Sequence, residues 1–140
     1  MYPEENRSKQ MNKLVMVIDD SLTVRKIVEV SMRRAGIACV SYASGIEAIR
    51  GLTKQQDLVP DVVILDIGLP QMDGYRVARY LKMKYRYRNT AIIILSGHSS
   101  ALDRLKGRLS GAKEYLTKPF TTQEMMALVH AYLQVGPISA

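Results

Sequence analysis

Cysteine and histidine are scarce in this sequence of 140 residues, and their scarcity excludes two kinds of scaffold. The single Cys39 cannot form an intramolecular disulfide, and neither it nor His98 and His130 falls into the spacing of a zinc site. A disulfide framework and a structural zinc site are therefore poor explanations of how this chain folds. A lone cysteine fits a reducing compartment, so we expect a cytoplasmic location.

Long apolar runs are also missing. No run approaches the roughly 20 residues needed to span a bilayer, and the start, MYPEENRSKQMNK, has none of the apolar core of a secretory signal. We therefore expect no membrane insertion, a flexible tail over residues 1–13, one domain over 14–134 and a C-terminal tail over 135–140. With 47% hydrophobic residues, the chain is long enough for one well-buried domain and too short for two comfortable ones.

The charge balance is basic, but the basic residues do not form one block. The formal net charge of +7 permits binding to nucleic acid or to an acidic partner. The lysines and arginines are spread through RKIVEVSMRR, RYLKMKYRYR and DRLKGR, where they are mixed with apolar positions. This pattern is typical of solvated helix faces, and we do not expect direct DNA binding.

Five segments are predicted to be strands. Three are apolar runs typical of a parallel sheet covered on both faces, namely LVMVI (14–18), VVIL (62–65) and AIIIL (91–95). ACVSYA (38–43) and KEYLT (113–117) are weaker candidates. Helical spacing follows each of the first four strands, at Val24, Ile27, Val28 and Met32, at Ile46, Ile49 and Leu52, at Val77, Tyr80 and Leu81, and at Leu102, Leu105 and Leu109. A last helix over about 122–133 has capping-box spacing at Thr121 and Glu124.

Strand alternating with helix five times predicts an α/β fold with a doubly wound, five-stranded parallel sheet and helices on both faces. The natural strand order for five such units is 2-1-3-4-5. The winding direction then changes between strands 1 and 3. Ligands of such sheets bind there, beyond the carboxyl ends of the strands.

Five polar residues fall at these carboxyl ends. Asp19 and Asp20 follow the first strand, Asp66 the third, Ser96 the fourth and Lys118 the fifth. Each has an ordinary explanation alone, such as a helix cap at Asp20, a turn at Asp66 or Ser96, or a solvated lysine. Because all five fall on the edge that binds ligands, we favour one shared functional role over five separate structural ones.

Three carboxylates crowded at one edge repel one another, and either protonation or a cation relieves the repulsion. Oxygen ligands suit a hard, small ion such as Mg²⁺ that retains some water. Phosphoryl oxygens could then complete the site, with Lys118 neutralising their charge and Ser96 donating a hydrogen bond. Phosphoryl transfer needs little beyond such positioning, so we expect Asp66 to be the nucleophile that becomes an aspartyl phosphate.

The segments VIDDS, VVILDIGLPQMDG, IILSG and YLTKPF, in this order and spacing, resemble the response regulator receiver domain in its single-domain, CheY-like form. The resemblance covers about residues 14–133. It implies that Asp20 binds Mg²⁺ directly and that Asp19 binds it mostly through water. It also implies that the carbonyl of Gly68 is a further ligand of the ion. It also implies that Asp66 takes its phosphoryl group from a histidine kinase or phosphotransfer protein. The domain would then be a signalling module that does not act as an enzyme on other substrates.

The same resemblance implies how the signal leaves. Ser96 and Lys118 contact the phosphoryl group, Lys118-Pro119 is a cis peptide bond, and Tyr115 is the aromatic switch. A downstream protein effector reads the face made by 100–109, 113–117 and 122–133, and the chain is a monomer or a phosphorylation-linked dimer. The alternative is that Tyr115 is only an edge-strand aromatic residue that covers the last helix. The basic residues on this face predict an acidic partner; they are Arg104, Lys106, Arg108 and Lys113.

A second similarity, in DDSLTVRKIVE and KGRLSGAKEYLTKPF, points to the CheY-like regulators of twitching motility and related chemosensory arrays. Two positions depart from the usual receiver pattern. Gly68 supplies no side chain two residues after the acceptor, and His98 stands two residues after Ser96. Such positions tune the phosphate lifetime in the family, so the resemblance does not fix that lifetime here.

Three other functions fit the sequence less well. Phosphatases of the haloacid dehalogenase type carry a second Asp two residues after the nucleophile, where this chain has Gly68. Flavodoxin-like and dinucleotide-binding modules need a Gly-rich or hydroxyl-rich loop after the first strand, where this chain has DDSLTVRK. A transcription factor needs an output domain, and only QVGPISA follows Leu133.

Overall fold

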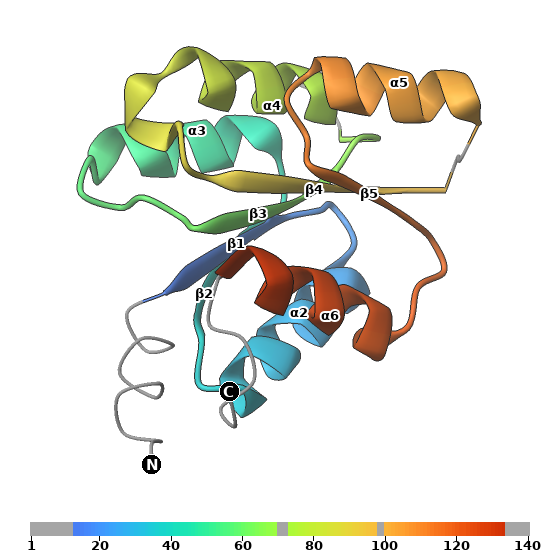
Figure 1. Ribbon diagram of the computed structural model, residues 1–140. Coiled ribbons are helices and arrows are strands. Elements are labelled where there is room, and N and C mark those ends of the chain that lie inside the picture. The colour runs from blue at the N-terminus through green and yellow to red at the C-terminus, as the bar shows by residue number, and fades with distance from the viewer. Residues whose placement is uncertain (1–12, 70–72, 98–99, 134–140) are drawn as a thin grey trace.

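Five parallel strands form one sheet at the centre of the computed structural model, which describes residues 13–69, 73–97 and 100–133 (Figure 1). The strands are β1 (Leu14–Ile18), β2 (Ala38–Tyr42), β3 (Val62–Asp66), β4 (Ala91–Ser96) and β5 (Glu114–Thr117). Their order across the sheet is β2-β1-β3-β4-β5. The predicted topology is therefore confirmed, and the predicted strand bounds hold to within one residue.

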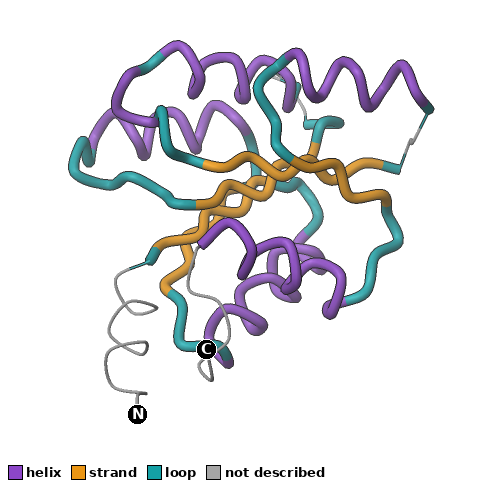
Figure 2. The backbone as a smooth tube through the Cα atoms, viewed as in Figure 1, coloured by secondary structure: helices purple, strands orange, loops and turns teal. Residues whose placement is uncertain are grey.

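Helices cover both faces of the sheet, as predicted. They are α2 (Leu22–Arg34), α3 (Gly45–Lys54), α4 (Gly74–Met83), α5 (Ala101–Leu109) and α6 (Thr122–Leu133), with a 3₁₀ turn, η1 (Tyr85–Tyr87), after α4. One face carries α3, α4 and α5, and the other carries α2 and α6 (Figures 1 and 2). Among the described residues, no helix is long and apolar enough to cross a bilayer.

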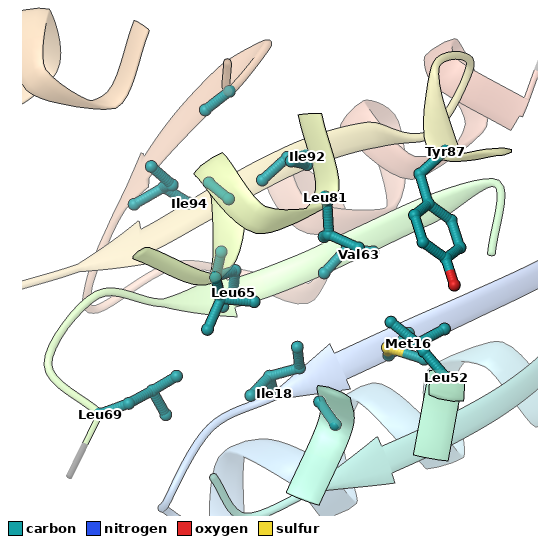
Figure 3. Packing of buried hydrophobic residues seen from close by; sticks show 14 residues of the cluster. Met16, Ile18, Leu52, Val63, Leu65, Leu69, Leu81, Tyr87, Ile92 and Ile94 are labelled. Carbon is teal, nitrogen blue, oxygen red and sulfur yellow. The ribbon is translucent and has the colours of Figure 1, made fainter. Parts of the chain in front are cut away.

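Side chains of successive strand residues point to opposite faces, which divides the core into two clusters. Val15 and Val17 pack with α2 and α6, whereas Met16 and Ile18 pack with α3 and α4. Figure 3 shows the second cluster, in which the ring of Tyr87 from η1 joins the strand residues. The strands have no polar alternation because both of these faces are buried.

Local hydrogen bonds fix where the helices begin. The Ser21 hydroxyl accepts from the Val24 N–H at the start of α2, 3.2 Å away. The capping box predicted for α6 is confirmed, since Thr121 N–H donates to Glu124 Oε1 at 2.8 Å and Glu124 N–H donates to Thr121 Oγ1 at 3.0 Å. These caps satisfy backbone N–H groups that the first turn of a helix leaves unpaired.

Helix α5 differs from the pattern that its apolar residues predict. Leu102, Leu105 and Leu109 lie on one side of the helix, but that side faces solvent, with exposed fractions of 60%, 48% and 77%. The residue that α5 buries is Gly107, where a Cβ atom would lie 3.1 Å from the Tyr115 ring. The helix therefore packs closely on the sheet through a glycine, and its leucines are left on the surface.

Candidate functional site

The carboxyl ends of β1, β3, β4 and β5 bring the predicted polar residues to one edge of the sheet. Asp66 is the last residue of β3 and Ser96 is the last residue of β4, while Asp19 directly follows β1. Carboxylate oxygens of Asp19, Asp20 and Asp66 all lie within 4.8 Å of one another. The three carboxylates that the sequence predicted to meet therefore do so.

Asp19 is a fully buried carboxylate with both oxygens occupied. Its Oδ1 accepts a hydrogen bond from the Ser21 N–H at 2.8 Å, and its Oδ2 lies 3.0 Å from Lys118 Nζ. The Arg25 guanidinium donates to its backbone carbonyl at 2.7 Å. Asp20, by contrast, is exposed and makes no hydrogen bond to a described residue. Of the two, Asp20 is the carboxylate free to take a new ligand.

Asp66 lies in the middle of the cluster and is 8% exposed. Its Oδ1 accepts the Gly68 N–H at 3.0 Å and lies 3.8 Å from Lys118 Nζ. Burial raises the pKa of Asp66 above its ordinary value, the Gly68 N–H opposes this rise, and the neighbouring charge of Asp19 adds to it. The carboxylate is therefore held in a site where its negative charge is disfavoured until a cation or a covalent group offsets it.

Strand pairing carries Lys118 to the carboxylates. Ser96 pairs with Thr117, and the Lys118 N–H donates to the Ser96 carbonyl at 2.6 Å. The Lys118–Pro119 peptide bond that follows is cis, as the family resemblance implied. The Lys118 side chain is 28% exposed, so its ammonium group is also open to a ligand. Ser96 is 2% exposed and ends on the same edge as Asp66.

Close backbone packing shapes the loop after Asp66. A Cβ atom on Gly74 would lie 2.5 Å from the Asp66 carbonyl oxygen and 2.6 Å from Ile67 Cα. The N-terminus of α4 therefore approaches the end of β3 more closely than any side chain permits. Gly68 is exposed beside the acceptor. Gly74 is not among the residues predicted from the sequence, although the glycine in MDG was a signal of such an approach.

A tyrosine pair joins this edge to α5. The Tyr75 hydroxyl donates to the Asp103 carbonyl at 3.3 Å, and burial, with the charge and hydrogen bond of Tyr115, raises the pKa of Tyr75 to about 12. Tyr115 is half-buried, packs against Gly107 and Ile94, and lies 5.3 Å below the Arg104 guanidinium. No local sequence signal predicted Tyr75, because its partners lie 28 or more residues away. His98 lies outside the described residues.

The raised pKa of Asp66 predicts a stability effect. The folded chain holds the Asp66 proton more tightly than the unfolded chain, so this contribution to stability is lost as pH rises through the raised pKa. We expect Asp66→Asn to melt a few degrees above the parent at pH 7 without divalent metal. The difference should shrink below about pH 4, where the parent carboxyl is also neutral. Calorimetry at both pH values measures this, and a variant that melts lower at pH 7 would contradict it.

The donor set fits a hard cation. Asp19, Asp20 and Asp66 offer only oxygen atoms, and the cluster has three carboxylates against the single ammonium group of Lys118. Oxygen ligands with excess negative charge favour Mg²⁺ over softer metals. The Gly68 residue beside Asp66 is exposed, so the loop after β3 is open at the same edge.

The sequence and the fold match known proteins. A model of the response regulator receiver domain family matches residues 15–130. Protein PilG of Pseudomonas aeruginosa is 34% identical over 119 residues, which are 85% of this chain and 86% of that protein. RpaA of Synechocystis, a DNA-binding dual master transcriptional regulator, is 32% identical over 120 residues, and the match spans 48% of its length. The structure of Vibrio cholerae chemotaxis protein CheY4 superposes with a TM-score of 0.78 at 29% identity, covering 86% of this chain and 98% of that one.

Proposed function

This chain belongs to the response regulator receiver domain family, and on that premise we propose that it is a stand-alone response regulator whose Asp66 accepts a phosphoryl group in a two-component phosphorelay. The observation that carries the proposal is the convergence of Asp66 with the acidic pair, Ser96 and Lys118 at one edge of the sheet. The matches to PilG and CheY4, which span most of both proteins, support the stand-alone form. CheY4 is a chemotaxis protein, which supports a role in chemosensory signalling, and the second sequence similarity extends the proposal to twitching motility.

The donor in this proposal is a phosphohistidine of a histidine kinase or phosphotransfer protein. A carboxylate oxygen of Asp66 attacks the phosphorus, the new O–P bond forms, and the N–P bond breaks with its electron pair returning to the imidazole. Lys118 Nζ, 3.8 Å from Asp66 Oδ1, offsets the charge of the transferred group, and the Ser96 hydroxyl donates to it. The chain promotes only its own phosphorylation and dephosphorylation.

We assign Mg²⁺ to Asp20, Asp66 and the Gly68 carbonyl, with Asp19 acting mostly through water. When bound, the ion supplies the positive charge that lets carboxylates and phosphoryl oxygens share one site. The surroundings of the acidic pair support these roles, since the Asp19 oxygens already accept from Ser21 N–H and Lys118 whereas Asp20 is exposed.

We expect Asp20→Ala to weaken Mg²⁺ binding about tenfold more than Asp19→Ala, because losing a direct ligand removes an ion–oxygen contact while losing an outer one disturbs a water. Amide chemical shifts of the loop after β3, followed during Mg²⁺ titration, give both affinities. Glu47→Gln on α3 is the control for the loss of one exposed carboxylate. Equal affinities for the two aspartate variants would count against the assignment.

In this proposal the downstream effector binds the face made by α5, β5 and α6. Tyr115 lies at its centre, where Gly107 leaves room for the ring and the Tyr75 hydroxyl gives it a hydrogen-bond partner. A movement of Ser96 toward the phosphoryl group would change the space beside Tyr115, since β4 and β5 are adjacent. The basic residues of this face are exposed, which favours an acidic effector; they are Arg104, Lys106, Arg108 and Lys113.

We expect Ser96→Ala to separate occupancy of Asp66 from the response at Tyr115. In NMR spectra recorded with the phosphate analogue beryllofluoride, the parent should show shifts at Asp66 and across α5 and β5. The variant should keep the Asp66 shifts and lose most of those around Tyr115, because the hydroxyl that links the two is gone. Ser31→Ala, which removes a half-buried hydroxyl bonded within α2, is the matched control. Equal large shifts on this face in the variant and the parent would mean that the signal leaves by another route.

A further inference from the structure

A cavity of about 380 Å³ lies at the opposite end of the strands from Asp66. It opens between the last turn of α3 and η1, the elements that come before β3 and β4 in the chain. Figure 1 shows α3 and α4 ending at the same side of the molecule. The lining residues are Leu52, Thr53, Gln56, Tyr80, Lys84, Tyr85, Arg86 and Tyr87. The cavity therefore shares no residue with the acidic cluster.

The charge around this cavity has one sign. Two of the lining residues are cations, Lys84 and Arg86, and none is an acid. Arg88 lies beside them, with its guanidinium 3.9 Å from the centre of the Tyr85 ring. Within the described part of the chain, none of these three cations forms a salt bridge. They are held by other contacts, including a 3.2 Å hydrogen bond from Arg86 to Gln56 and a 5.2 Å approach of Lys84 to the Tyr80 ring.

The floor of the cavity is apolar and carries one free hydroxyl. Leu52 and Tyr87 are 1% and 3% exposed, and Figure 3 shows the Tyr87 ring directed toward Leu52 and Met16. The Tyr87 hydroxyl has no hydrogen-bond partner among the described residues. No buried side-chain oxygen or nitrogen of those residues is left unpaired, so this hydroxyl must reach solvent through the cavity that it lines.

The rim adds an exposed aromatic surface. Tyr85 is 79% exposed, although a ring of this size is normally covered in part. Arginine stacked on one side of a tyrosine, with lysine and arginine nearby, is an arrangement that binds nucleic acid bases and their phosphates. A solvated basic helix face explains the cations, but it does not explain why Tyr85 is exposed at the rim of a cavity whose floor carries the Tyr87 hydroxyl.

We propose that this cavity binds a nucleotide, with the base stacked on the ring of Tyr85 and the phosphate held by Lys84 and Arg86. The ring and the two cations are the complement of a planar, anionic ligand. The nucleotide could be free or could belong to a nucleic acid strand, and both present the same base and phosphate. An acidic protein segment would use the cations but would leave the tyrosine surface without a stacking partner, so we favour the nucleotide.

Titration with 5′-AMP, followed by NMR amide shifts, tests this inference directly. We expect saturable shifts at Thr53, Gln56 and residues 84–87, smaller effects with adenosine or inorganic phosphate alone, and weaker binding as salt rises. The double variant Lys84→Gln/Arg86→Gln should weaken binding by about tenfold or more, since 1.4 kcal/mol corresponds to that factor. The control Lys106→Gln/Arg108→Gln removes the same charge from α5 and should leave the affinity nearly unchanged.

The source of the nucleotide follows from a parallel titration with a short single-stranded oligonucleotide. Tighter binding of the oligonucleotide than of AMP would identify a nucleic acid strand, and equal binding would identify a free nucleotide. Absence of saturable AMP shifts, equal loss in the two double variants, or binding of an acidic peptide such as hexaglutamate in place of AMP would overturn the inference. None of these outcomes depends on Asp66, so they do not bear on the phosphorylation proposal.

Discussion

Lys118→Ala is expected to destabilise the fold by roughly 3 kcal/mol at pH 7, because it leaves a buried carboxylate without its cation. Asp19 is fully buried and lies 3.0 Å from Lys118 Nζ, while Asp66 lies 3.8 Å away. The lysine also opposes the rise in the pKa of Asp66, so its removal favours the protonated form of that carboxyl further. Chemical denaturation in the absence of divalent metal measures the loss.

Two comparisons separate this electrostatic effect from lost packing. Lys118→Arg keeps the charge and should recover most of the stability. The loss in Lys118→Ala should shrink at acid pH, where the Asp66 carboxyl, whose pKa is raised by burial, is neutral. Mg²⁺ should restore part of it by replacing the missing charge. A loss that is the same at pH 4 and pH 7 would show that Lys118 acts through packing alone.

The sequence was sufficient for the fold because each strand carries its own signal. The runs 14–18, 62–65 and 91–95 are apolar at every position, and the structure buries both faces of the strands that they form. Right-handed connections between parallel strands limit the possible topologies, and the order 2-1-3-4-5 was the natural expectation for five such units. The candidate site follows from the same pattern, since Asp19, Asp66 and Ser96 are polar residues where buried strands end.

Other features depend on contacts between distant segments, and the sequence could not predict them. Leu102, Leu105 and Leu109 have the spacing of a buried helix face, yet the close packing of Gly107 turns that face outward. Tyr75 meets Asp103 only after α4 and α5 are placed side by side. The basic segment RYLKMKYRYR has the pattern of a solvated helix face. The cavity that this segment lines forms only because the end of α3 lies against η1.

Asp66→Asn is expected to abolish phosphorylation of this chain. Asp66 and Asp19 both lie within 4 Å of Lys118. Both side-chain oxygens of Asp19 are already engaged, by Ser21 N–H and by Lys118, whereas Asp66 keeps an oxygen available for attack. Asp20 is exposed and has no salt bridge to Lys118. An amide at position 66 fills the same space but cannot attack phosphorus as a carboxylate does, so the loss should be complete while the fold persists. Asp20→Asn, by contrast, should slow the reaction through weaker Mg²⁺ binding.

The most direct test of phosphorylation at Asp66 is the intact mass of the protein after incubation with acetyl phosphate and Mg²⁺. The parent should gain the mass of one phosphoryl group, the gain should vanish when Mg²⁺ is chelated, and Asp66→Asn should show none under the same conditions. A circular dichroism spectrum and a melting curve of the variant confirm that it is folded. An Asp66→Asn protein that gains a phosphoryl group in the same yield as the parent would contradict the account.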